Sequence, residues 1–317
     1  MVLDAGDSVW VRTIVFHPDG KHLLGGTDKG TLRWRLADGR EVGRQMGIYT
    51  YALSVSRDHK WIVCGTNEGV SVWDGEMNER VINMESGTSA AFVVDVSPDS
   101  TRFAIGTFNV SVWSITSGQR LVGPLQHDNM VNAVRFSPGT GERIATACME
   151  NFMCIFDSHT GDKLVTLNAR SPSWLGTPLA WSGDGQQIFA ASRDNKVRSF
   201  DVSTGFQLAE SQILHDDGDN NVLSIALAAN GKFIATSVAW HLVSFLDTST
   251  LKQVGPVIKE NGLMGSIAIS ADSSYLATAQ EGGKFVLRDL SNILPDSYGP
   301  FHVSSHNPGL LSPSHQC

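Results

Sequence analysis

Residues 131–161 read VNAVRFSPGTGERIATACMENFMCIFDSHTG, and this stretch decides the fold. Apolar residues alternate from 131 to 136, and a Pro-Gly turn follows at 138–139. A second apolar run covers 144–147 and a third covers 152–156, with a polar break between them and a Thr-Gly turn beyond. Three short strands joined by tight turns form a β-meander. A meander this small cannot bury both of its faces, so it needs neighbours of the same kind.

The same unit recurs seven times along the chain. The residue that ends the third strand of each copy is, in order, Trp34, Trp73, Trp113, Phe156, Phe200, Leu246 and Arg288. The first turn recurs in register as HPDG (17–20), SRDH (56–59), SPDS (97–100), SPGTGE (137–142), SGDG (182–185), AANG (228–231) and SADS (270–273). A fourth apolar run follows most copies. Seven four-stranded units at a period of about 40 residues predict an all-β chain folded as a seven-bladed β-propeller of four-stranded antiparallel blades.

The repeats resemble those of the WD-repeat propellers over roughly residues 9–303. A narrower likeness lies in the fourth-strand segments VGPLQ (122–126), VGPVI (254–258) and YGPF (298–301). These segments are similar to those of long WD-repeat arrays attached to STAND-type signalling NTPases. The resemblance implies a platform for binding proteins or peptides, and it leaves open a sensor or regulatory fragment of a larger signalling NTPase.

We predict one WD-repeat β-propeller over residues 1–303 and a disordered tail over 304–317. The predicted blades cover 9–43, 49–84, 89–126, 131–168, 175–213, 222–258 and 264–303. Residues 1–8 are too short to supply a full strand, and the last blade is expected to bring its own outer strand at 298–303. We therefore expect a ring that closes without the N-terminal interlocking strand of many WD-repeat propellers.

Composition narrows the classes of partner and compartment. The net charge is −8 with no basic run, which argues against a nucleic-acid backbone as partner. No apolar stretch reaches membrane-spanning length and no signal peptide is visible, so we expect no membrane partner. Cys64, Cys148, Cys154 and Cys317 have no CxxC spacing, and the first three fall in strand patterns. Buried free thiols fit a reducing compartment, the cytoplasm or the nucleus.

The family resemblance implies a buried tetrad in each blade, made of a His, a Ser or Thr, an Asp and a Trp. No copy has the full set. The nearest is in blade 4, with His127, Thr146, Glu150 and Phe156. In blade 7 the Trp position holds Arg288, whose charged head is expected to reach water. We therefore expect blade stability to rest on apolar packing more than on polar networks.

The search for catalytic and metal-binding patterns is negative. There is no GxSxG, no HExxH, no phosphate-cradling loop and no paired Cys/His ligands. His17 and His59 fall in first-hairpin turns, where we expect solvent-facing side chains. The acidic stretch 215–221 lacks the spacing of a calcium loop. The inner strands offer mainly Val, Ile, Leu, Ala and Phe, with Asp95 and Arg135 as exceptions, which is too little for a metal or cofactor cage. We predict no catalytic residues, no metal and no cofactor, although a propeller hydrolase such as a lactonase is the alternative from another class.

Partner-binding residues are expected on the face where each inner strand begins, as the resemblance implies. Two side chains per blade flank the first apolar residue there, and the hairpin between strands two and three adds one more. Trp, Tyr and Arg are enriched at binding hot spots, and several gather on this rim. The predicted partner-binding residues are Trp10, Arg12, Tyr49, Tyr51, Phe92, Met130, Asn132 and Arg193. The competing interpretation is that these aromatic side chains plug the channel or pack between blades.

Overall fold

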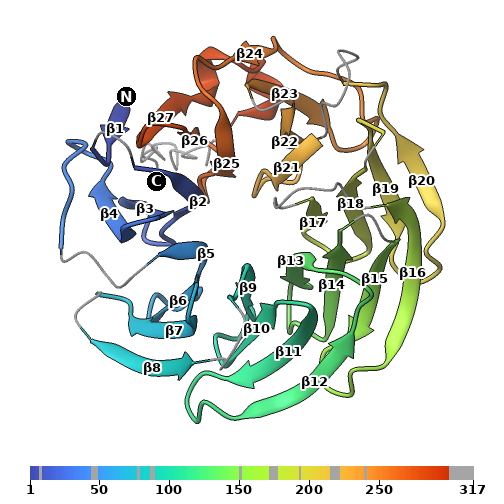
Figure 1. Cartoon of the computed structure of the whole chain (residues 1–317). Coiled ribbons are helices and arrows are strands. Elements are labelled where there is room, and N and C mark those ends of the chain that lie inside the picture. The colour runs from blue at the N-terminus through green and yellow to red at the C-terminus, as the bar shows by residue number, and fades with distance from the viewer. Residues whose placement is uncertain are drawn as a thin grey trace, which may run out of the picture.

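The computed structural model describes residues 1–6, 9–43, 49–76, 79–85, 90–149, 152–170, 178–192, 194–214, 222–238 and 241–299. Seven antiparallel sheets stand radially around one axis (Figure 1). The predicted seven-bladed β-propeller is confirmed, and the described residues contain no α-helix.

Each blade is a meander that runs from the channel outward. The inner strands are β2 (Val11–Phe16), β5 (Thr50–Val55), β9 (Val93–Val96), β13 (Val131–Phe136), β17 (Leu179–Trp181), β21 (Val222–Leu227) and β25 (Met264–Ile269). The second strands are β3 (His22–Thr27), β6 (Trp61–Thr66), β10 (Arg102–Gly106), β14 (Arg143–Cys148), β18 (Gln187–Ala191), β22 (Phe233–Val238) and β26 (Tyr275–Gln280). The third strands are β4 (Gly30–Arg35), β7 (Gly69–Asp74), β11 (Asn109–Ser114), β15 (Phe152–Asp157), β19 (Val197–Asp201), β23 (Leu242–Asp247) and β27 (Lys284–Asp289).

The outer strands are the least regular. They are β8 (Arg80–Glu85), β12 (Arg120–Gln126), β16 (Lys163–Arg170), β20 (Gln207–Glu210) and the short β24 (Ile258–Lys259). In blade 1 the sheet has three strands, and the fourth position is marked by an isolated bridge between Trp34 and Glu41.

The apolar core lies between blades, because each blade buries its faces against its neighbours. At the junction of blades 7 and 1, Phe285 packs on Trp34 with ring centroids 4.4 Å apart. Gly25 makes this approach possible, since a Cβ there would lie 2.5 Å from the Phe285 ring. An Ala at position 25 would force this junction apart.

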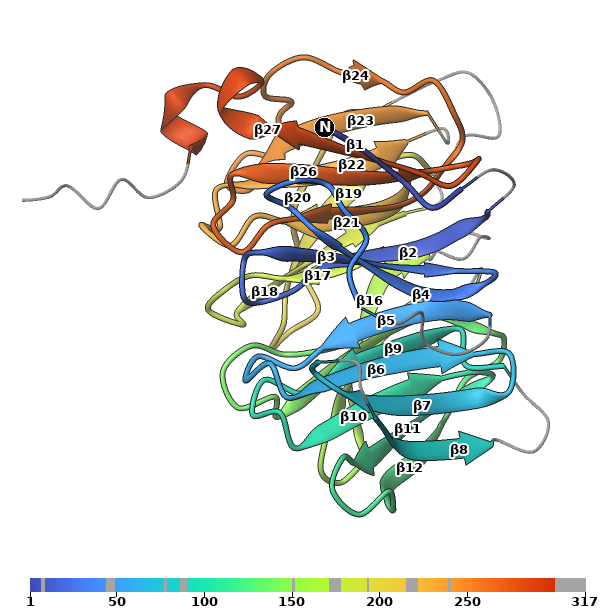
Figure 2. The ribbon, with the colours of Figure 1, turned by 90° about the vertical axis from the view of Figure 1, so that its left-hand side faces the viewer.

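The expected closure without an interlocking strand is wrong. Strand β1 (Val2–Asp4) pairs antiparallel with β27, in the register Val2 with Val286, and forms the outer edge of blade 7 (Figure 2). Leu3 is 1% exposed and lies in the core between blades 7 and 1. The Met1 ammonium donates to the Leu287 carbonyl at 2.8 Å. The three-residue strand β1 can close the ring because the burial of Leu3 and the hydrogen bonds to β27 act together.

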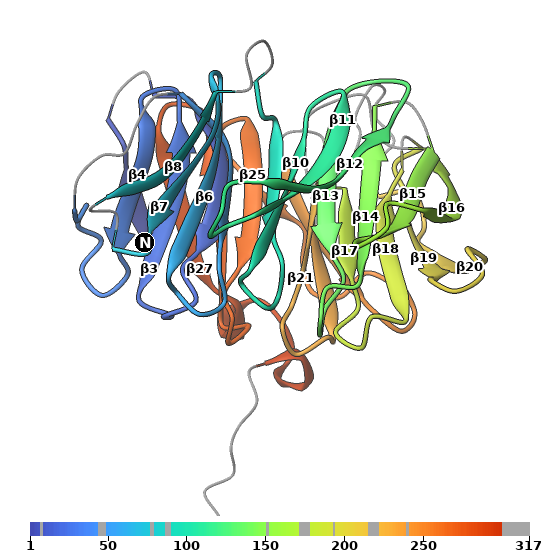
Figure 3. The ribbon, with the colours of Figure 1, turned by 90° about the horizontal axis from the view of Figure 1, so that it is seen from below.

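The expected outer strand at 298–303 is also wrong where the structure describes it. After β27 the chain forms two short 3-10 turns, η1 (Leu290–Asn292) and η2 (Asp296–Tyr298), which project from one face (Figure 3). They pack under blade 6, where the Tyr298 hydroxyl donates to Asp247 Oδ2 at 2.9 Å. Residues 300–303 and the tail 304–317 lie outside the described residues.

The polar tetrads are replaced blade by blade. In blade 4, His127 Nε2 lies 2.9 Å from Thr146 Oγ1, while Glu150 lies outside the described residues. In blade 7 the Arg288 head does not rely on water, because it pairs with the buried carboxylate of Glu260 at 2.6 Å. The prediction that Cys64, Cys148 and Cys154 are buried free thiols is confirmed.

Candidate partner-binding site

The inner strands carry a β-bulge near the face where they begin. The pairing register shifts between Val11 and Thr13 in blade 1, and between Thr50 and Ala52 in blade 2. Blade 4 has the same shift between Val131 and Ala133. A bulge adds one residue and re-aims its side chain. The bulged residues are Arg12, Tyr51 and Asn132, three of the predicted site residues.

Arg12 lies at the centre of an aromatic cluster built by blades 1 and 2. Its guanidinium carbon lies 4.7 Å from the Trp10 ring centroid, 5.6 Å from that of Tyr49 and 5.9 Å from that of Tyr51. Arg12 Nη2 donates to the Tyr49 hydroxyl at 2.6 Å, and Nε donates to the same oxygen at 3.1 Å. A cation over aromatic faces is held in place by their quadrupoles. The four side chains therefore form one preorganised surface.

Blade 3 extends this surface with Phe92. The rings of Tyr49 and Tyr51 lie 4.7 Å apart, and the ring of Phe92 meets that of Tyr51 edge-on at 5.2 Å. Trp10 is 49% exposed, whereas Arg12, both tyrosines and Phe92 are half-buried. We name Trp10, Arg12, Tyr49, Tyr51 and Phe92 the aromatic rim.

The second hairpins of the same blades hold the backbone of the rim. The backbone N–H of Trp10 donates to Asp28 Oδ1 at 3.1 Å, and the Asp28 N–H donates back to the Trp10 carbonyl. The Phe92 N–H donates to the Gly106 carbonyl at 3.2 Å. Rigid loops of this kind are where binding sites are usually found.

Arg12 carries the only charge within the aromatic rim. Among the described residues no carboxylate pairs with Arg12, and its Nε and Nη2 both donate to the Tyr49 hydroxyl. A guanidinium has five N–H donors, and the bonds to Tyr49 use two of them, so Arg12 can donate further hydrogen bonds to a ligand. The surface thus offers apolar rings around a cation.

The other predicted site residues are distributed differently. Met130 is half-buried on blade 4, away from the contacts that join the rim. Asn132 is 0% exposed, so its side chain is not available to a partner, and its inclusion in the site is corrected. Arg193 lies outside the described residues. The bulge alone does not separate Asn132 from the rim, because Arg12 and Tyr51 occupy the same bulged position and stay half-buried.

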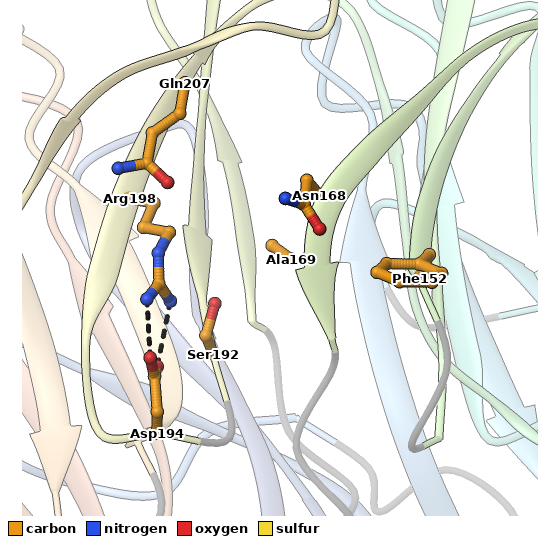
Figure 4. A pocket seen from close by; sticks show the side chains of 7 residues that line it. All are labelled: Phe152, Asn168, Ala169, Ser192, Asp194, Arg198 and Gln207. Atoms are coloured by element: carbon orange, nitrogen blue, oxygen red, sulfur yellow. Dashed lines mark hydrogen bonds and ion pairs between the residues drawn. The ribbon is translucent and has the colours of Figure 1, made fainter.

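A second hollow lies between blades 4 and 5, and sequence reasoning missed it. Its volume is about 500 Å3, and its lining residues are Phe152, Asn168, Ala169, Ser192, Asp194, Arg198 and Gln207 (Figure 4). Arg198 donates to both carboxylate oxygens of Asp194 and lies 3.3 Å from Glu210. The pairing with Arg198 lowers the pKa of the Asp194 carboxyl. Arg198 therefore offers this hollow no free cation, unlike Arg12 in the rim.

Asp95 and Arg135, the charged residues of the inner strands of blades 3 and 4, are structural. Asp95 Oδ2 accepts the Phe136 N–H at 2.8 Å, and Arg135 Nη1 lies 3.9 Å from Asp95 Oδ1. Burial raises the pKa of Asp95, and the nearby Arg135 opposes that rise. The Trp181 indole donates to the Arg135 carbonyl at 3.1 Å. These contacts tie blades 3, 4 and 5 together.

Comparisons with known proteins support the fold and its family. The family model for the WD domain, G-beta repeat, matches residues 2–34 and 179–201. Autophagy-related protein 16 of Arabidopsis thaliana is 24% identical over 237 residues, which make up 72% of this chain and 44% of that protein. The chain therefore spans less than half the length of this relative.

Solved propellers superpose over nearly the whole chain. The β-propeller domain of Myceliophteria thermophila Cps50 (Swd1) gives a TM-score of 0.74 at 18% identity, covering 91% of this chain and 99% of that one. The RRP9 WD40 repeats give 0.77 at 15% identity, covering 91% and 97%. U3-55K gives 0.76 at 15% identity, covering 93% and 98%. The chain thus has the fold of the WD-repeat β-propellers, and two of its segments match the repeat of that family.

No helix within the described residues is long and apolar enough to cross a membrane.

Proposed function

We propose that this propeller is a non-catalytic scaffold that binds a protein or peptide partner on the face where its inner strands begin. The observation that carries the proposal is the aromatic rim, in which a cation and four rings from three successive blades form one surface. Aromatic and arginine side chains at the centre of a rigid surface are typical binding hot spots. The relatives are WD-repeat proteins, a class of interaction scaffolds, which agrees with this role.

The rim also indicates the chemistry of the partner. Arg12 has donors in reserve and no carboxylate partner among the described residues, so an acidic side chain is the complementary group. Trp10 and the tyrosines offer flat apolar faces beside it. A segment with an Asp or Glu next to an apolar side chain fits both features. The net charge of −8 supports a protein partner over a nucleic acid.

The test is the double variant Trp10→Ala with Tyr49→Ala in the full chain. Each hot-spot truncation weakens binding by about 2 kcal/mol or more, which is about 30-fold in Kd. Affinity capture followed by mass spectrometry identifies partners of the wild-type chain, and the double variant is expected to lose them. Thermal unfolding is expected to stay nearly unchanged, because Trp10 is 49% exposed.

Phe206→Ala is the matched control. Phe206 is 74% exposed in the turn after β19, on the opposite face, so its removal should leave capture intact. Arg12→Gln tests the charge, and it should weaken acidic partners while leaving the stacked rings in place. Equal capture by the wild-type and double-variant chains, or loss of the fold in the double variant, would contradict the proposal.

For its setting, we propose a reducing compartment, the cytoplasm or the nucleus, with no membrane partner. Three buried free thiols support this assignment. The narrower proposal, a sensor region of a larger signalling NTPase, rests on the fourth-strand segments quoted above. A gene model extended upstream would test it.

A further inference from the structure

The first turns of the seven blades are copies of one design, and blade 1 departs from it. Five blades begin this turn with a serine, at positions 56, 97, 137, 182 and 270. Where the turn is Ser-x-Asp, the hydroxyl donates to the aspartate, as in Ser56 to Asp58 at 2.7 Å and Ser182 to Asp184 at 2.6 Å. Blade 1 has His17 in this position, with Nδ1 3.1 Å from Asp19 Oδ2.

Two further histidines lie at other positions of the repeat. His22 begins β3, at a position with no common residue, which in the other blades holds Trp61, Arg102, Arg143, Gln187, Phe233 and Tyr275. His59 in blade 2 has φ 66°, and the equivalent left-handed positions elsewhere hold only glycine or serine. Side chains other than glycine adopt this region at a cost. Three unrelated repeat positions have thus each become histidine.

Two of the three histidines meet at one carboxylate, and the third packs against one of them. Asp19 Oδ2 lies 2.6 Å from His22 Nδ1 and 3.1 Å from His17 Nδ1. The ligand atoms of His17, Asp19 and His22 all lie within 4.8 Å of one another. The His59 ring lies edge-on to that of His17, with centroids 5.4 Å apart. Asp19 Oδ1 accepts the backbone N–H groups of Lys21 and His22, which aims Oδ2 at the imidazoles.

His17 is an independent sign that the cluster is built for a ligand. The expectation that His17 faces solvent is wrong, since the residue is 5% exposed. Its Nε2 is buried without a hydrogen-bond partner among the described residues. If Nε2 carries the ring proton, Nδ1 accepts the Asp19 backbone N–H at 3.3 Å, but it also faces Asp19 Oδ2, and the buried Nε2–H has no acceptor. If Nδ1 carries it, Nε2 is a buried acceptor with no donor, which is costly.

We propose that His17, Asp19 and His22, with His59 as fourth ligand, bind a divalent transition-metal ion of the zinc type. Imidazole nitrogen and carboxylate oxygen are ligands that zinc accepts in tetrahedral sites. Bonds of about 2.0–2.1 Å place tetrahedral ligand atoms about 3.4 Å apart. From the present distances of 2.6 Å and 3.1 Å, His22 must therefore move away from Asp19 Oδ2 by about 0.8 Å and His17 by about 0.3 Å. The ring protons that face the metal are released to solvent on binding.

The site would join blades 1 and 2 on the face opposite the aromatic rim. His17, Asp19 and His22 belong to the first hairpin of blade 1, and His59 belongs to the first turn of blade 2. Blade 1 has a three-stranded sheet and lies next to the closure of the ring. A metal here adds a cross-link where the sheet is weakest.

The test uses Zn²⁺ and the full chain at pH 7, with substitutions drawn from the chain's own repeats. His17→Ser restores the residue of five other blades, and His22→Gln restores the residue of blade 5, so both should fold. The matched control is His159→Ser, which removes an exposed histidine in a turn of blade 4 where blade 5 has Ser203. Calorimetric titration gives affinity and stoichiometry, and Zn²⁺-dependent unfolding gives a second readout.

We expect one tight Zn²⁺ per wild-type chain, with a raised Tm. Loss of an outer-sphere partner weakens metal affinity by about 10–100-fold, so loss of a ligand in His22→Gln should cost about 100-fold or more. His59→Gly should weaken binding by about tenfold, and His159→Ser should change nothing. Equal affinity and stoichiometry in the wild type and His22→Gln would overturn the site. Equal affinity in His59→Gly would overturn the assignment of the fourth ligand. His22→Gln alone suffices if the His17 variant does not fold.

Discussion

Blades 4 and 7 fill the same three positions with opposite chemistry. In blade 4 the residue four before the inner strand is His127, and its partners are Thr146 and the ring of Phe156. In blade 7 the same positions hold Glu260, Thr278 and Arg288. In blade 4 one hydrogen bond, between His127 and Thr146, joins these positions, whereas blade 7 has an ion pair in which the carboxylate side chain is 2% exposed.

The difference between the two blades shows which property these three positions must keep, namely a partner for every buried polar group. Glu260 accepts from Thr278 at 3.0 Å, from Gln280 at 2.6 Å and from both terminal nitrogens of Arg288. All of its acceptor capacity is therefore used, which a buried carboxylate requires. The sheet geometry tolerates either chemistry as long as every buried donor and acceptor finds a partner. The family tetrad is one solution among several in this chain.

The largest effect is expected from Glu260→Gln. The change keeps the shape of the side chain and leaves the Arg288 guanidinium without its counter-charge. Breaking a buried pair by removing one partner costs about 3–5 kcal/mol. Denaturant unfolding of the variant should show a loss of that size.

A second change separates charge from packing in that result. Adding Arg288→Leu supplies the residue that blade 6 has in the same position, Leu246, and removes the unpaired cation. The double variant should recover at least half of the lost stability. If it is no more stable than Glu260→Gln alone, the ion pair is not the cause of the loss.

A smaller loss is expected from Thr146→Val in blade 4. The variant removes the partner of His127 Nε2 and should cost about 1–2 kcal/mol. Thr236→Val in blade 6 is the matched control. Thr236 occupies the same register and donates only to the Ser244 carbonyl. Equal losses in the two variants would show that the histidine contributes nothing.

The smallest effect is a change in pH dependence. Burial holds the pKa of His127 below its ordinary value of 6.5, against the opposing hydrogen bond to the Leu125 carbonyl. The unfolded chain then binds more protons near pH 6.5, so this contribution to stability is complete above that pH and is lost as the pH falls. His127→Gln should flatten the fall in Tm between neutral and mildly acidic pH. If the fall in Tm with pH is the same in His127→Gln and the wild type, a group other than His127 causes the pH dependence.

The period and the first turns were enough to predict seven blades. The closing strand was missed because Val2–Asp4 is too short to show periodicity, and its partner β27 is far away in sequence. No local pattern marks a three-residue strand whose stability depends on one buried leucine in a distant blade.

The candidate binding site was predicted only in part from the sequence. Trp10, Arg12, Tyr49, Tyr51 and Phe92 came together because equivalent repeat positions lie side by side around a ring. The prediction for Asn132 is wrong because this side chain is 0% exposed, although it occupies the same bulged position as Arg12 and Tyr51, and the sequence alone does not show its burial. The histidine cluster did leave a signal, since aligning the seven first turns shows His17 where most blades have serine.

Because Val2 pairs with Val286, the strand that closes the ring must wait for its partner until nearly the whole chain has been synthesised. At about 5–20 residues per second, roughly 15–60 s pass between the emergence of these two residues from the ribosome. During that interval the first strand has no edge to join, and the growing blades form an open arc with two bare ends. Sealing of the circle is therefore the final step, and a nascent chain halted before the seventh blade would expose both ends to whatever else can pair with a strand.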